Sequence, residues 1–106
     1  MVNENAIYDR IAIQNMLSFE EIMTQLAEEC SELSMAALKY RRAAEKANPT
    51  PVTSVEAYNN LLEEVTDVIN VLFVAGLIHP DYPVTHYIDS KKIARWKNRL
   101  TGLEAC

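Results

Sequence analysis

One acidic phrase occurs twice in this chain, and its spacing constrains the fold more than any other feature. Residues 28–32 read E-E-C-S-E, and residues 63–67 read E-E-V-T-D. On a helix, residues three positions apart share one face. Each phrase contains such an acidic pair: Glu29 with Glu32, and Glu64 with Asp67. If the two helices face each other, four carboxylates meet in a small volume and repel unless a cation lies between them. The phrase therefore predicts facing helices with a divalent-metal site.

The composition agrees with an all-α fold. The chain has only two glycines and four prolines among 106 residues, and it is rich in good helix formers such as alanine, leucine and glutamate. Its length suits one small domain over residues 1–106. Because so small a domain buries a limited share of its surface, we also expect oligomerisation.

Helix signals divide the chain into four helical segments. Their predicted ranges are about 7–17, 18–47, 53–78 and 85–100. Capping-box patterns, a serine or threonine followed three residues later by glutamate, begin the second and third segments at Ser18 and Thr53. The proline-rich stretches 48–51 and 79–83 separate the later segments. The sequence therefore predicts a four-helix protein.

The acidic pairs lie at the edge of the predicted core. The apolar stripe of the second segment consists of Ile22, Leu26, Leu33, Ala37 and Tyr40. The stripe of the third consists of Leu61, Val65, Val68, Ile69 and Leu72. Glu29 and Glu64 border these stripes, whereas Glu63 turns towards solvent. A carboxylate at a core boundary is costly unless it is paired, hydrogen-bonded or ligated.

Carboxylates without histidine or cysteine partners select hard cations, so Mg²⁺ is favoured, Mn²⁺ is possible and zinc is not favoured. Mg²⁺ keeps several waters and binds best when a substrate phosphate completes its shell. The chemistry suggested is metal-assisted attack of water on a phosphoanhydride. The alternative is an acidic, solvated helix surface whose carboxylates pair with lysine or arginine.

The pattern E-E-x-x-E on one long helix, followed by E-x-x-D on the next, resembles the MazG-like members of the all-α nucleoside triphosphate pyrophosphohydrolase superfamily. That superfamily also includes dimeric dUTPases and phosphoribosyl-ATP pyrophosphohydrolases. The resemblance covers roughly residues 19–74. The 31 residues between Glu32 and Glu64 exceed the spacer typical of the family, and the proline-rich loop around residues 46–54 can hold the surplus.

The resemblance implies a MazG-like helical bundle, completed as a homodimer or homotetramer, that cleaves a nucleoside triphosphate into a monophosphate and pyrophosphate. It implies that the metal ligands are Glu29, Glu32, Glu64 and Asp67. The general base would be Glu28 or whichever of these carboxylates is not fully committed to the metal. House-cleaning of noncanonical nucleotides is one role for such an enzyme.

Five further residues are candidates for contacts with substrate. Lys91 and Arg95 belong to a basic segment that could approach phosphates, and Trp96 could stack on a base. Gln25 could contact a base or hydrogen-bond a ligand carboxylate, and Asn70 could contact sugar or phosphate. Four of them have a structural alternative: a solvated basic face for Lys91 and Arg95, core packing for Trp96, and an exposed helix position for Asn70.

The net charge, the first residues and the cysteines bear on possible partners and on the cellular compartment. A formal charge of −5 argues against binding a nucleic-acid polymer. The first residues lack the pattern of a signal peptide, the longest apolar run is too short to span a membrane, and two unpaired cysteines suit a reducing compartment. We therefore expect a cytoplasmic protein. The alternative to an enzyme is a non-catalytic helical module that binds a nucleotide or a protein.

Overall fold

The structure, a computed structural model, describes residues 2–46 and 50–102. Over these residues it contains helices and no strands, which confirms the all-α prediction. The elements are α1 (Glu4–Met16), α2 (Phe19–Glu45), α3 (Ser54–Ala75), the 3₁₀ turn η1 (Val84–Tyr87) and α4 (Ser90–Thr101). None of the helices described is both long enough and apolar enough to cross a membrane.

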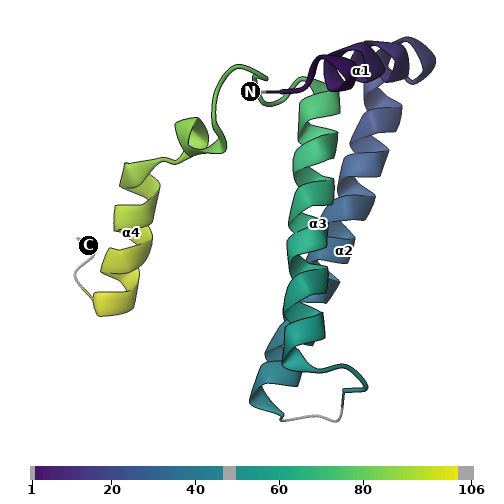
Figure 1. Cartoon of the computed structure of the whole chain (residues 1–106). Coiled ribbons are helices and arrows are strands. Elements are labelled where there is room, and N and C mark those ends of the chain that lie inside the picture. The colour runs from purple at the N-terminus through teal and green to yellow at the C-terminus, as the bar shows by residue number, and fades with distance from the viewer. Residues whose placement is uncertain (1, 47–49, 103–106) are drawn as a thin grey trace.

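Helices α2 and α3 run side by side in opposite directions and form a long hairpin (Figure 1). Along α2, a row of buried and half-buried residues recurs in alternating steps of four and three: Ile22, Leu26, Glu29, Leu33, Ala36, Tyr40 and Ala43. A matching row follows α3: Ala57, Leu61, Glu64, Val68, Val71 and Ala75. This is the spacing with which two helices pack in a coiled coil. Glu29 and Glu64 therefore occupy positions of the helix–helix seam.

Helix α1 crosses the end of the hairpin where α2 begins and α3 ends (Figure 1). The side-chain amide of Gln14 donates a hydrogen bond to the carbonyl oxygen of Val74 at 2.8 Å. The guanidinium of Arg10 lies over the ring of Phe73, 4.9 Å from its centroid, which is a cation–π contact. These contacts fix α1 to the C-terminal end of α3.

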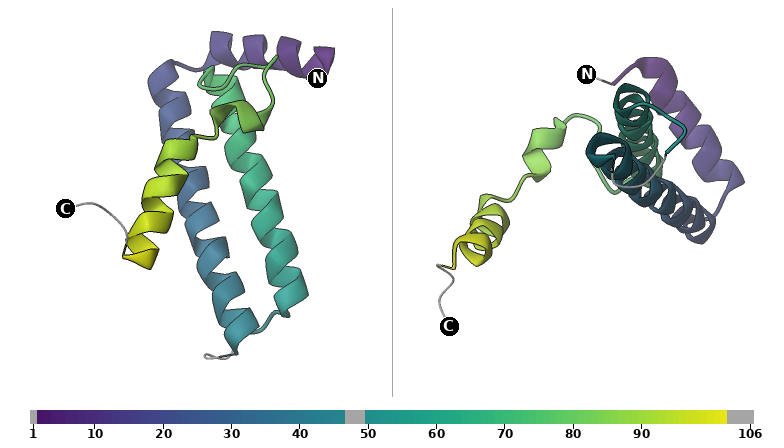
Figure 2. Two further views of the ribbon diagram at one scale, coloured as in Figure 1. Left: turned by 90° about the vertical axis from the view of Figure 1, so that its left-hand side faces the viewer. Right: turned by 90° about the horizontal axis from the view of Figure 1, so that it is seen from below.

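Helix α4 stands apart from the hairpin, as Figure 1 and the right-hand view of Figure 2 both show. The radius of gyration is 17.5 Å, whereas a compact domain of this length has about 13 Å. Among the described residues only Ile22 and Ala57 are fully buried, with 4% and 1% of their surface exposed. The single chain is therefore four-helical but does not close a four-helix bundle.

Two predicted helix boundaries change because of caps. The first helix begins at Glu4 instead of residue 7, because the side chain of Asn3 accepts a hydrogen bond from the backbone N–H of Asn5 at 2.7 Å. The third helix ends at Ala75 instead of residue 78. Its next residue, Gly76, has a φ of 77°, in the left-handed region where glycine stops a helix without strain.

The predicted fourth helix is two elements. Residues 84–87 form the 3₁₀ turn, and α4 begins only at Ser90. The carboxylate of Asp89 accepts hydrogen bonds from the backbone N–H groups of Lys91 and Lys92 and so caps the helix at this point. The predicted end of the second helix, at Ala47, lies outside the described residues.

Two residues of the predicted apolar stripes are exposed. Ala37 and Val65 face away from the seam, and Ala36 and Val71 take seam positions. The stripes were centred on apolar residues alone, whereas the actual seam also includes Glu29. The interface between α2 and α3 therefore lies nearer to Glu29 and Glu64 than the predicted apolar stripes do.

The capping box at the start of α2 is confirmed. The Ser18 hydroxyl accepts a hydrogen bond from the backbone N–H of Glu21, whose carboxylate accepts one from the N–H of Ser18. We expect Ser18→Ala to lower the free energy of unfolding by about 1 kcal/mol. The matched control is Ser34→Ala in the middle of α2, which should leave stability nearly unchanged. Urea unfolding followed by circular dichroism measures both, and equal effects would contradict the cap.

Candidate metal centre

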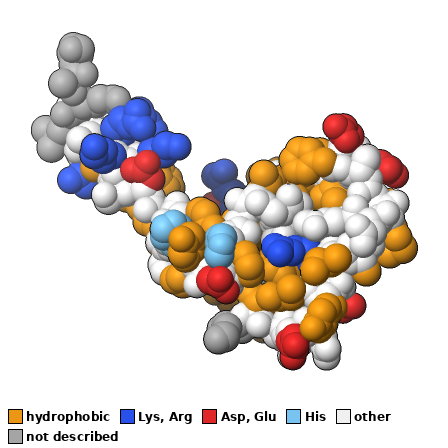
Figure 3. All heavy atoms as spheres, turned by 90° about the horizontal axis from the view of Figure 1, so that it is seen from above, with side chains coloured by type: hydrophobic (Ala, Val, Ile, Leu, Met, Phe, Trp, Pro, Cys, Tyr) orange, Lys and Arg blue, Asp and Glu red, His pale blue; other side chains and the backbone are white. Residues whose placement is uncertain are grey.

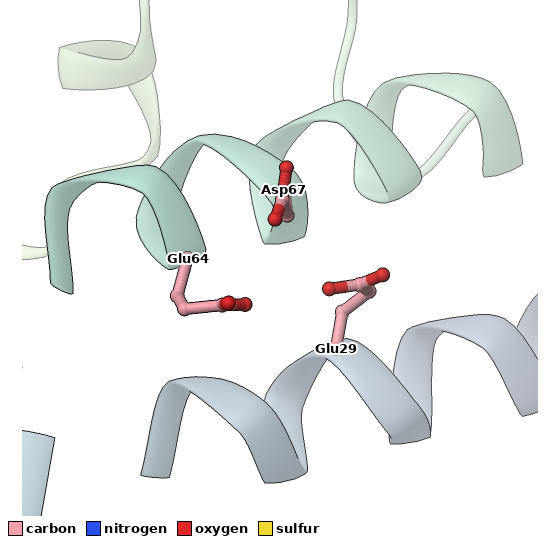
Figure 4. A group of neighbouring side chains, drawn as sticks. All are labelled: Glu29, Glu64 and Asp67. Atoms are coloured by element: carbon pink, nitrogen blue, oxygen red, sulfur yellow. The ribbon is translucent and has the colours of Figure 1, made fainter. Parts of the chain in front are cut away.

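Three carboxylates from two helices converge at the middle of the hairpin. Glu29 comes from α2, and Glu64 and Asp67 come from α3 (Figure 4). One oxygen from each lies within 4.8 Å of the others. Glu32, one turn after Glu29, is electrostatically coupled to all three. The structure therefore brings together three of the four carboxylates of the predicted acidic pairs, and Glu32 lies near enough to interact with them electrostatically.

The seam explains why these groups are held so close. Glu29 and Glu64 lie on the inner rows of the two helices, so their carboxylates are half-buried where the helices meet. The side-chain amide of Gln25 donates a hydrogen bond to Oε1 of Glu29 at 3.0 Å and fixes that carboxylate. Gln25 thus makes the predicted hydrogen bond to the carboxylate of Glu29, and its predicted contact with a base stays a prediction.

Two buried oxygens remain without a donor. Among the described residues, Oε2 of Glu29 and Oε2 of Glu64 are inaccessible to solvent and accept no hydrogen bond. An unpartnered buried carboxylate oxygen is costly, and a bound cation removes that cost. The donor set, oxygen atoms alone and all of them anionic, suits Mg²⁺ or Mn²⁺.

The charges of the cluster are not balanced by basic side chains. The ion pairs found within the described ranges join Arg41 to Glu45 and His79 to Asp81, and neither reaches the cluster. The alternative in which the cluster carboxylates pair with lysine or arginine is therefore not the arrangement observed.

Repulsion and partial burial raise the pKa of two members of the cluster. The nearby charge of Glu29 raises the pKa of Glu32 above its ordinary value of 4.5, and the charges of Glu64 and Asp67 add to this. Partial burial raises the pKa of Glu64, and Asp67 and Glu29 raise it further. A divalent cation would reverse both effects, because it stabilises the ionised carboxylates.

A pocket of about 260 Å³ opens beside the cluster. Its lining includes Glu32 and Glu64 of the cluster together with Lys39, Asn60 and Met35. Sequence reasoning did not single out Lys39. The signal was its position seven residues after Glu32, two helical turns along the same side of α2. Lys39 and Asn60 are the polar groups best placed to contact a ligand bound at the carboxylates.

A larger pocket, of about 520 Å³, lies where α2 ends and α3 begins. Its described lining includes Arg42, Lys46 and Thr53 and contains no carboxylate. Since size alone does not supply metal ligands, we place the site at the smaller pocket.

The structure does not place the other predicted site residues in the convergent group within one chain. Glu28 and Asn70 are exposed on α2 and α3 and are not among the three convergent carboxylates. Lys91, Arg95 and Trp96 are exposed on α4, which stands apart from the hairpin (Figure 2). Any contact between these α4 residues and the cluster requires α4 to move or a second chain to provide it.

Comparison of the chain with protein-family models, with curated proteins and with solved structures finds no match.

Proposed function

We propose that this protein is a Mg²⁺-dependent nucleoside triphosphate pyrophosphohydrolase. The observation that carries the proposal is the convergence of Glu29, Glu64 and Asp67 between α2 and α3, where one buried oxygen of Glu29 and one of Glu64 have no hydrogen-bond donor. The arrangement of the acidic phrases on two facing helices is the one implied by the resemblance to MazG-like enzymes. A pocket beside the carboxylates gives a substrate a place to bind.

In this proposal, Glu29, Glu32, Glu64 and Asp67 would hold the metal, which would supply positive charge to the phosphates and make water a better nucleophile. Gln25 keeps Glu29 oriented through its hydrogen bond. Lys39 and Asn60 contact the polar parts of the nucleotide from the pocket wall.

The chain's own residues also provide a proton acceptor. Glu28, or whichever carboxylate of the cluster is not fully committed to the metal, would serve as the general base. The base takes a proton from the attacking water as a new P–O bond forms at the α-phosphorus. The bond between that phosphorus and the bridging oxygen breaks, and pyrophosphate leaves with the bonding electrons.

A second function is a non-catalytic helical module that binds a nucleotide or a protein. One observation favours it: within a single chain the basic residues of α4 lie away from the acidic cluster (Figure 2). Catalysis of phosphoryl transfer usually draws on positive charge beyond the metal.

We also propose that the protein is a homo-oligomer. The chain exposes 8273 Å², whereas a compact monomer of 12.0 kDa exposes about 6000 Å². Large apolar side chains account for part of the excess, including Tyr58, Leu62 and Trp96. Association between copies would bury this surface.

A pyrophosphate-release screen tests the proposed activity. Canonical and modified nucleoside triphosphates, dUTP and phosphoribosyl-ATP are incubated with the protein in Mg²⁺, in Mn²⁺ and in EDTA. We expect release of one pyrophosphate per nucleoside monophosphate with at least one substrate, and none in EDTA. If no compound is cleaved with either metal, or if EDTA has no effect, the proposed function is wrong.

A further inference from the structure

Helix α4 carries an apolar row that the described residues of its own chain leave exposed. Ile93, Trp96 and Leu100 are spaced by three and four residues and so share one face of the helix. Their exposed fractions are 53%, 60% and 75%. An isolated helix of 12 residues is marginal in water, and its stability depends on packing such a face. The row therefore requires a partner surface.

Helix α3 presents a row of the same kind. Tyr58, Leu62 and Val65 are spaced by four and three residues, and they are 48%, 48% and 37% exposed. Helical spacing places this row on the side of α3 away from Glu63 and Asp67. Both rows span seven residues, which is about 10.5 Å on a helix. They match in length and in the step pattern with which two helices interlock.

The net charges of helix α4 and of the rest of the chain are opposite in sign. Residues 90–101 contain five basic and no acidic residues, and residues 1–89 contain fourteen acidic and five basic residues. Figure 3 shows a group of lysine and arginine side chains on the extended arm that α4 forms, with others on the body of the molecule. Opposite charges attract at long range and favour an encounter between the arm and a hairpin.

The linker holds α4 away from its own hairpin. It contains Pro80 and Pro83, each of which fixes its backbone φ. The ring of Tyr82 stacks between those of His79 and His86, with centroid separations of 4.5 and 4.3 Å. The hydroxyl of Tyr87 accepts a hydrogen bond from the backbone N–H of His79. A linker stiffened in this way favours exchange of the arm between chains over closure onto its own chain.

The area available agrees with an exchanged dimer. The chain exposes roughly 2000 Å² more than a compact monomer of its mass. Permanent homodimers bury about 2000 Å² or more in total. Each exchanged arm would cover one apolar row of the partner. The excess surface of the two chains together is large enough for a dimer of this kind.

We infer that two copies of this chain exchange their C-terminal arms. Helix α4 of each copy docks on α3 of the other, with Ile93, Trp96 and Leu100 against the partner's exposed α3 row. The exchange rests on the exposed apolar rows and on the opposite net charges of α4 and the rest of the chain. It does not depend on nucleotide hydrolysis. Because the α3 row and the acidic cluster lie on different sides of the hairpin, docking leaves the cluster accessible.

Trp96 reports the docking without any modification, because it is the only tryptophan of the chain. We expect light scattering to show a dimer, and dilution to shift the tryptophan emission to longer wavelength as the dimer dissociates. Leu62→Glu should weaken association at least about tenfold. Leu38→Glu, a matched change at an exposed leucine of α2, should not weaken it. Circular dichroism verifies that both variants remain helical.

Cysteine cross-linking separates exchange from closure. Both chains first lose their native cysteines through Cys30→Ser and Cys106→Ser. One chain then carries Leu62→Cys, the other carries Ile93→Cys and a different tag, and the two are mixed. We expect a disulfide-linked heterodimer, and much less of it when Asn98→Cys, on the far side of α4, replaces Ile93→Cys. The inference is overturned if the protein is monomeric, if it is a dimer with a solvent-exposed Trp96, or if the disulfide forms only within a chain that carries both cysteines. All of these experiments omit metal and nucleotide, so their failure leaves the proposed hydrolysis untouched.

Discussion

Glu64→Gln should lower metal-dependent pyrophosphate release by at least about 100-fold, because loss of even an indirect metal partner typically costs 10- to 100-fold. The amide keeps the size of the side chain but removes a negative charge and one anionic oxygen from the cluster. Oε2 of Glu64 is buried without a hydrogen-bond donor, so a cation bound there would be the partner that this oxygen otherwise lacks.

Steady-state assays over a range of Mg²⁺ concentrations measure the effect. The control is Glu20→Gln, the same substitution at an exposed position in the first turn of α2. The control should retain full activity. If Glu64→Gln and Glu20→Gln behave alike, Glu64 does not hold the catalytic metal.

Glu64→Gln should raise the stability of the metal-free protein at neutral pH, although it lowers activity. Like charges and burial raise the pKa of Glu64 in the folded state, so the folded protein binds this proton more tightly than the unfolded chain does. By linkage, metal-free stability then falls as the pH rises from about the ordinary carboxyl pKa of 4.5 through the raised value, and stays low above it. Glu32 acts in the same direction.

Thermal unfolding of wild type and Glu64→Gln, in EDTA and in Mg²⁺ from pH 4 to pH 8, measures this linkage. At neutral pH in EDTA we expect the variant to be the more stable protein, with a weaker fall of stability with pH. Mg²⁺ at 100 times its Kd should stabilise wild type by about 2.7 kcal/mol and the variant much less. A variant that is less stable than wild type in EDTA would show that the cluster does not carry the inferred repulsion.

The helical part of the fold follows from local sequence signals. Ser18 and Thr53 begin α2 and α3 as predicted, because a side-chain oxygen at this position accepts a hydrogen bond from a free backbone N–H. The missed boundaries have equally local causes. Asn3, Gly76 and Asp89 are ordinary capping residues. Each cap is a signal of one residue, and the predicted boundaries followed the apolar periodicity around it instead.

The arrangement of the helices was less predictable. Periodicity shows that Ile93, Trp96 and Leu100 share a face, but it does not say whether that face contacts the same chain or another. The stacked rings and prolines of the linker decide the direction of α4, and these are contacts between residues of a loop.

The acidic cluster was predictable because spacing and core position pointed to the same residues. Glu29 and Glu64 border the apolar stripes in the sequence and lie on the seam in the structure. Lys39 was missed because an isolated lysine on a helix has no distinctive spacing until the pocket is seen. Lys91 and Arg95 were chosen for their charge, which does not tell where α4 lies.

Titration of the metal-free protein with Mn²⁺, followed by electron paramagnetic resonance, tests most directly whether the facing carboxylates bind a divalent cation. We expect saturable binding to wild type and to Glu20→Gln, displacement by Mg²⁺, and loss of binding in both Glu29→Gln and Asp67→Asn. Wild type that binds no Mn²⁺, or variants that bind it as wild type does, would contradict a metal centre between α2 and α3.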